Sequence, residues 1–173
     1  ALKYLGYSIN TTDPAKLDEA VELLLDAKRN FKTFAPDTGQ DLLLSREVDL
    51  ALEYNGDVLQ VMEEDDDLAY VVPEEGSIIW EDDMVIPTGA PHVEAAHEFI
   101  NYVHDPENNA QIAAWVMYPT PNEAAKALLP EEITGNASIY PPDEILDRCE
   151  YAAYQGEEAQ ALRDDAMTRV LAG

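Results

Sequence analysis

The stretch EEGSIIWEDDMVIPTGAP, residues 74–91, places an indole directly before three carboxylates, inside a run whose apolar residues predict buried extended backbone. Successive side chains of a β-strand point to opposite faces, so Trp80 and Asp82 would share one face, and Glu81 and Asp83 the other. An aromatic face attracts an alkylammonium group by about 0.5–2 kcal/mol, and a nearby carboxylate adds a charge-assisted hydrogen bond. Trp80 and Asp82 therefore form either an ammonium clamp or a core tryptophan beside a capping acid, and spacing alone leaves both open.

On either side of this stretch the hydrophobic period changes repeatedly between that of a helix and that of a strand. Asp13 before Pro14, and Asp105 before Pro106, are typical of helix starts. Segments with strand and helix periods that alternate along the chain indicate an α/β fold rather than a sandwich or a bundle. Helices are expected within residues 10–31, 37–48, 56–66, 91–104, 105–117, 122–129 and 141–172, and extended segments within 31–35, 48–54, 68–72 and 77–87. The segment 48–54 is expected to end in a tight turn at Asn55 and Gly56.

The charge of the chain excludes one class of partner. It has 36 acidic and 10 basic residues and a formal net charge of -26, whereas nucleic-acid binding needs clustered Lys and Arg. An excess of carboxylates either attracts a cationic ligand or forms a solvated surface suited to high salt. The acids are spread through several predicted helices and cannot all line one site, which favours the second interpretation for most of them.

Five segments of the chain resemble, in order and with nearly constant spacing, the C-terminal half of the spermidine/putrescine-binding proteins of ABC importers. The resemblance covers essentially the whole sequence, and it includes the Trp80 strand and a turn with two prolines. The segments are LGYSINTTDP (5–14), REVDLALEYNGD (46–57), YVVPEEGSIIWEDDMVIP (70–87), AAHEFINYVHDPENNAQIAAWVMYPTPNEAAKALL (95–129) and SIYPPDEI (138–145).

The resemblance implies a periplasmic-binding-protein type II fold, in which two lobes close on a linear polyamine. Residues 1–80 and 127–173 would form most of the second, C-terminal lobe, incomplete at its N-terminal side. Residues 81–126 would be a segment of the first lobe. The opening ALKYLGY has the pattern of a last helical turn closed by Gly6, which predicts further sequence upstream.

The resemblance also implies a ligand site. Trp80 matches a family tryptophan that stacks on the ligand, and Asp82 matches the acid that pairs with a terminal amine. Tyr118 matches a binding tyrosine in the YPTPN turn. Tyr54 lies where polyamine binders commonly have tryptophan, so the aromatic wall is kept with a different shape.

Other family contacts are absent from this stretch. A family glutamine aligns approximately with Ala152, so that contact is lost unless Gln155 supplies it. Two family acids would lie upstream of Ala1. Neither a cofactor nor a metal is expected.

The function implied is that of a periplasmic or membrane-tethered extracellular protein that captures a polyamine and delivers it to a membrane permease. Self-association of the chain is also expected, because apolar surface that the rest of a two-lobed protein covers would be exposed. The family pattern does not identify the preferred polyamine.

The residues alone leave two other functions open. Carboxylate oxygens suit hard cations, so a solute-binding protein for a metal ion or another cation is an alternative. A hydrolase that uses Asp82 and Asp83 as acid and base is a second alternative, although adjacent strand residues face opposite sides. His92 and His97 would point about 140° apart on a helix, since a helix turns about 100° per residue, which disfavours a histidine metal site.

The acid-rich composition predicts that added salt stabilises the folded chain. Carboxylates that repel one another across the surface are screened as the Debye length falls from about 30 Å at 0.01 M to about 3 Å at 1 M ionic strength. The melting temperature, followed by circular dichroism, is expected to rise over this range of KCl. A melting temperature that does not change with KCl would contradict the proposed adaptation to salt.

Overall fold

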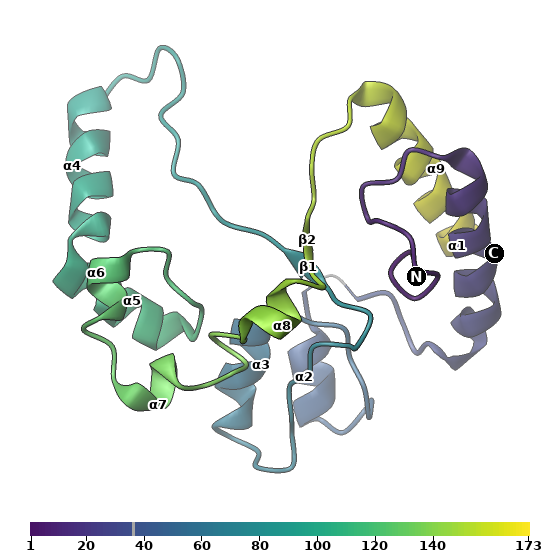
Figure 1. Cartoon of the computed structure of the whole chain (residues 1–173), viewed down its shortest axis with the longest axis horizontal. Helices are drawn as coiled ribbons and strands as arrows, with labels where there is room; N and C mark the ends of the chain where they lie inside the picture. The colour runs from purple at the N-terminus through teal and green to yellow at the C-terminus, as the bar shows by residue number, and fades with distance from the viewer. Residues whose placement is uncertain (36) are drawn as a thin grey trace. The chain divides into compact units, whose positions relative to one another are not determined.

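The computed structural model describes residues 1–35 and 37–173, which fall into two compact units (Figure 1). Unit 1 comprises Ala1–Phe34, Val72–Trp80 and Asp143–Gly173, and unit 2 comprises Ala35–Val71 and Glu81–Pro142. These units and the predicted lobes both change between Trp80 and Glu81, but residues 35–71 lie in unit 2, whereas the lobe prediction grouped them with 1–34. The units describe this chain alone, so the lobe assignment stays a prediction.

Two helices, α1 (Pro14–Ala27) and α9 (Glu157–Ala172), pack together in unit 1. The carboxylate of Asp13 accepts a hydrogen bond from the Ala15 N–H at 3.0 Å and caps α1. Leu17 and Val21, one turn apart, are buried, and Val170 of α9 is 1% exposed. A short 3₁₀ helix, η1 (Lys28–Asn30), follows α1. The ammonium of Lys28 donates to the carbonyls of Val170 and Leu171 at 2.9 and 3.0 Å, where a cation also complements the dipole of α9.

The sheet of unit 1 consists of two short parallel strands, β1 (Ile78–Ile79) and β2 (Glu150–Tyr151), with α8 (Asp143–Leu146) shortly before β2. Ile78 pairs with Glu150, and Ile79 with Tyr151. Gly76 precedes β1 at φ +90°, and a Cβ there would overlap the carbonyl oxygen of Arg148. Glycine is therefore required where the two chain segments come together.

The first seven residues have the hydrogen bonds of a helix C-terminus. The Gly6 N–H donates to the Lys3 carbonyl and the Tyr7 N–H to the Leu2 carbonyl, both at 2.9 Å. Gly6 has a φ of 76°, the left-handed conformation that this type of cap uses. The local pattern of a last turn closed by Gly6 is present.

Unit 2 is helical. Its core contains three alanines, Ala110 and Ala113 of α5 and Ala125 of α6, together with Leu129, and the small alanines let α5 and α6 approach closely. A second buried set, Val58, Leu59 and Val61, lies on α3. The helices are α2 (Gly39–Leu44), α3 (Asn55–Met62), α4 (Val93–His104), α5 (Pro106–Val116), α6 (Glu123–Lys126) and α7 (Glu131–Thr134).

Most of the expected strands are not formed among the described residues. Residues 48–54 have no regular structure, and Leu50 and Leu52 are 88% and 96% exposed. Residues 31–35 are also irregular, with the rings of Phe31 and Phe34 packed edge to face at 5.5 Å. A strand needs a hydrogen-bonded neighbour, and alternation in the sequence does not provide one.

The structure corrects two further details. Asn55 and Gly56 begin α3 rather than forming a tight turn. The strand that precedes the three acids ends at Ile79, and residues 80–88 are irregular, so strand alternation does not place Asp82 on the same face as Trp80. Among residues 1–35 and 37–173, the helices are too short or too polar to cross a lipid bilayer.

Candidate functional site

Two of the predicted site residues, Tyr54 and Tyr118, lie with Asp57 in unit 2. Tyr54 is the residue immediately before α3, and Asp57 lies in the first turn of that helix. Tyr118 follows Met117, which ends α5 in the left-handed conformation at φ 59°. The Tyr118 hydroxyl donates to the Asp57 carboxylate and accepts from the Asp57 N–H. The ends of two helices thus bring an aromatic pair and an acid together.

The environment keeps Tyr118 in its neutral form. Burial raises the pKa of its phenol well above the usual value near 10, and the charge of Asp57, its hydrogen bond and the nearby Tyr54 raise it further. The hydroxyl therefore retains its proton, and its hydrogen bond to Asp57, across the physiological range.

Gly56 fixes the position of the Tyr118 ring. A Cβ at Gly56 would overlap three carbons of this ring, so the backbone of α3 and the ring of Tyr118 are in direct contact. Only glycine leaves enough space there without moving the tyrosine.

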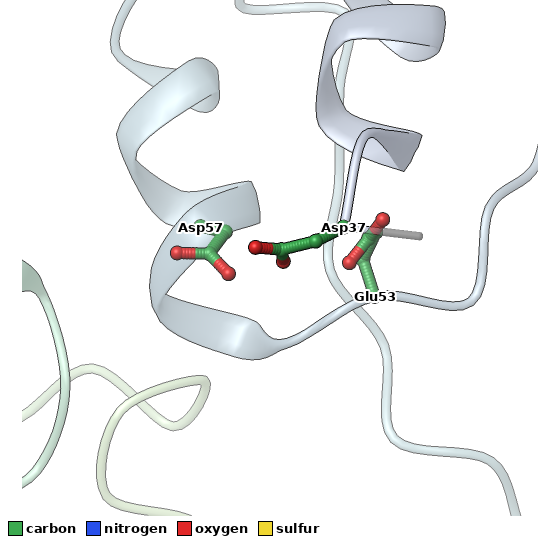
Figure 2. Close-up of side chains that lie close together, drawn as sticks. All are labelled: Asp37, Glu53 and Asp57. Atoms are coloured by element: carbon green, nitrogen blue, oxygen red, sulfur yellow. The ribbon is translucent and has the colours of Figure 1, made fainter. Parts of the chain in front are cut away.

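Three carboxylates lie on the same side of unit 2, those of Asp37, Glu53 and Asp57 (Figure 2). One oxygen from each lies within 4.8 Å of the others, and Figure 2 shows the three groups facing one another. The Gly39 N–H donates to Glu53 at 2.6 Å and holds that carboxylate in place. Like charges at this separation repel, so the group favours a cation nearby.

Trp80 and Asp82 stand on either side of the boundary between the units. Trp80 directly follows β1, ends its segment of unit 1 and is 40% exposed, so its indole is not sealed inside packed helices. Asp82 lies in unit 2 and is exposed. The ligand roles of Trp80, Asp82, Tyr118 and Tyr54 stay predictions.

Asp57 is the residue of this site that sequence reasoning missed. The helix expected within residues 56–66 includes Asp57, but the sequence does not show that this residue contacts Tyr118, 61 positions further along the chain. The available signal was its spacing, since Tyr54 and Asp57 are three residues apart and such residues share a face at the start of a helix.

Comparisons with known proteins agree on one class. Residues 1–140 match the family described as bacterial extracellular solute-binding protein. The chain is 34% identical over 173 residues to the "Spermidine/putrescine-binding periplasmic protein" of Salmonella typhimurium, an alignment that covers 100% of this chain and 49% of that protein. The chain spans about half the length of the curated relatives that it matches.

Two solved structures share the fold. A putative spermidine/putrescine ABC transporter from Listeria monocytogenes matches 98% of this chain and 52% of its own, at a TM-score of 0.90 and 35% identity. The substrate-binding protein PotD from Streptococcus pneumoniae, solved with calcium and HEPES, matches 99% of this chain and 53% of its own. The TM-score is 0.85 and the sequence identity is 34%. The α/β fold expected from the sequence is therefore confirmed for the half of these proteins that the chain matches.

Neutralising Asp57 is expected to lower the pKa of Tyr118 toward the ordinary value, because the neighbouring charge is removed while burial remains. The folded pKa lies above the unfolded one, so Tyr118 contributes stability in full below about pH 10 and loses that contribution as the pH rises further. Titration of the tyrosinate absorbance of Asp57→Asn, with Tyr118→Phe to assign the late step, measures the change. Asp66→Asn, at an exposed acid of the same unit, is the control. An unchanged late step in Asp57→Asn would contradict the assignment.

Proposed function

The chain belongs to the bacterial extracellular solute-binding proteins, and from this membership we propose that it is the C-terminal part of a protein that captures a polyamine and delivers it to an ABC transporter permease. The names of its relatives, which specify spermidine and putrescine, support the ligand. The titles of two structural neighbours support the transporter. A periplasmic or membrane-tethered extracellular location belongs to the same proposal.

The observation that carries the proposal is the arrangement of Tyr54, Tyr118 and Asp57 in unit 2. Polyamines are linear chains of methylene groups with protonated amines at neutral pH. Aromatic faces accept both the methylene groups and the ammonium charge, and a carboxylate adds a charge-assisted hydrogen bond. Asp37 and Glu53 increase the negative potential at this site, which favours the approach of such a cation.

Trp80 and Asp82 complete the proposed ligand set. The indole of Trp80 would stack on the methylene chain, and the carboxylate of Asp82 would pair with a terminal amine. Both side chains are accessible, as this role requires. The assignment of residues 1–80 and 127–173 to the second lobe, and of 81–126 to the first, is part of this proposal.

The three carboxylates alone do not distinguish an ammonium group from a metal ion, because both are attracted by clustered acids. The aromatic residues distinguish them. An oxygen-only metal site gains nothing from Tyr54, Tyr118 or Trp80, whereas an alkylammonium ligand does. We propose no catalytic role, since the relatives are named as binding proteins.

Self-association of the 173-residue chain is proposed as well. Several large apolar side chains of unit 2 are accessible, and exposed apolar surface promotes association. They include Leu50, Leu52, Phe99, Tyr102 and Trp115.

Calorimetric titration with spermidine tests the ligand on the protein produced from its complete gene. Trp80→Ala and Asp82→Asn are each expected to weaken binding by about tenfold or more, through lost stacking and a lost charge. Trp115→Ala is the matched control, because Trp115 is a second tryptophan, 83% exposed on α5 and outside the proposed site. Binding of a divalent metal that Trp80→Ala leaves unchanged, without binding of spermidine or putrescine, would favour the metal alternative.

The 173-residue chain by itself is expected to bind spermidine weakly or not at all. It spans about half the length of its relatives, and a linear ligand needs partners for both of its charged ends. The same titration, carried out on the isolated chain, measures this. Micromolar affinity of the isolated chain would show that these residues suffice.

A further inference from the structure

The segment that leaves β2 is held extended beyond the two residues of the strand. The side-chain amide of Asn10 donates to the Tyr151 carbonyl, and its oxygen accepts from the Ala153 N–H, both at 2.8 Å. A carbonyl and an N–H two residues apart point to the same side only where the backbone is extended, so Asn10 pairs with this edge as a strand would. On the opposite edge the Glu150 N–H donates to the Ser77 carbonyl at 3.0 Å.

The strand register brings Ala152 beside Trp80. Ile78 pairs with Glu150 and Ile79 with Tyr151, and continuing this register one residue beyond the strands sets Trp80 opposite Ala152. Residues paired across parallel strands project to the same face. The side chain of Ala152 is a methyl group, which takes up little space on this face.

Tyr154 is the next residue on that face. Side chains alternate along extended backbone, so Ala152 and Tyr154 lie on one face and Tyr151 on the other. Tyr154 is 76% exposed, and Figure 1 shows its segment running from β2 to α9 as an extended trace. From this register and alternation we expect the rings of Trp80 and Tyr154 to lie on either side of Ala152.

Glu150 lies on the same face as Ala152, on the side away from Tyr154. Its carboxylate accepts hydrogen bonds from the ammonium of Lys3, at 2.8 Å, and from the hydroxyl of Ser8, and these hold its pKa below the usual value. The charge of Glu150 is therefore paired within unit 1. What remains available on this face for a ligand is aromatic and aliphatic surface rather than an unpaired acid.

We propose that Tyr154 is a further ligand-binding residue, whose ring and that of Trp80 form a groove over Ala152 for the aliphatic segment of a linear amine cation. This assignment rests on the proposed function. Two aromatic faces bury methylene groups and stabilise a neighbouring ammonium charge, and the tyrosine hydroxyl accepts a hydrogen bond from an amine. The small side chain at position 152 is what keeps the groove open.

The test is calorimetric titration with spermidine on the protein produced from its complete gene. Tyr154→Ala is expected to raise Kd by about tenfold, since the loss of one aromatic wall is a loss of this order. Tyr151→Ala is the matched control, because it removes an exposed tyrosine three residues away on the opposite face, and its Kd should change less than about twofold. Ala152→Leu, which fills the groove and leaves both rings in place, is expected to weaken binding as well.

The outcomes separate this inference from the proposed function. Unchanged melting temperatures show that the variants are folded, as expected for substitutions at exposed positions. If Tyr154→Ala and Ala152→Leu bind as the unchanged protein does, while Trp80→Ala loses affinity, the groove is disproved and the polyamine function stands. Equal losses in Tyr151→Ala and Tyr154→Ala also overturn the groove. Absence of spermidine binding to the unchanged protein overturns both.

Discussion

Hydrogen bonds along both edges of residues 150–153 hold unit 1 together. This unit is built from three stretches that are distant in sequence, and the segment touches the other two: β1 on one edge and Asn10 on the other. The Lys3–Glu150 ion pair adds a third link at the start of β2. Because β1 is fixed in this way, so is the start of the backbone at Trp80, the residue that follows it, and α1 packs on α9 within the same unit.

In unit 2 the aromatic residues of the candidate site are placed by helix ends instead of strand pairing. Tyr54 and Tyr118 lie where helices begin and end, and helix ends carry backbone groups without intrahelical partners. Tyr118 satisfies part of that need by accepting from the Asp57 N–H while it donates to the same residue's carboxylate. The site thus combines a phenol that keeps its proton with carboxylate groups, a chemistry suited to a cation that also has an apolar chain.

Local signals predicted the helices well, and the strands poorly. Asp13 with Pro14, and Asp105 with Pro106, mark helix starts through contacts within a few residues, and both helices begin there. Residues 48–54 alternate as a strand does, but pairing is non-local and the described residues supply no partner. Of the site, Tyr54 and Tyr118 were predicted from a resemblance. Asp57 was not, because its role depends on a contact between the start of α3 and the end of α5, which are distant in sequence.

The contact between Gly56 and the ring of Tyr118 makes the residue accepted at each of these positions depend on the other. While the tyrosine remains, any side chain at position 56 meets its ring, so that glycine is fixed by a residue 62 positions further along the chain. A lineage that exchanged Tyr118 for a smaller residue would release position 56 to vary. Descendants of this protein with new solute preferences should therefore change these two positions as a pair, with the larger residue replaced first.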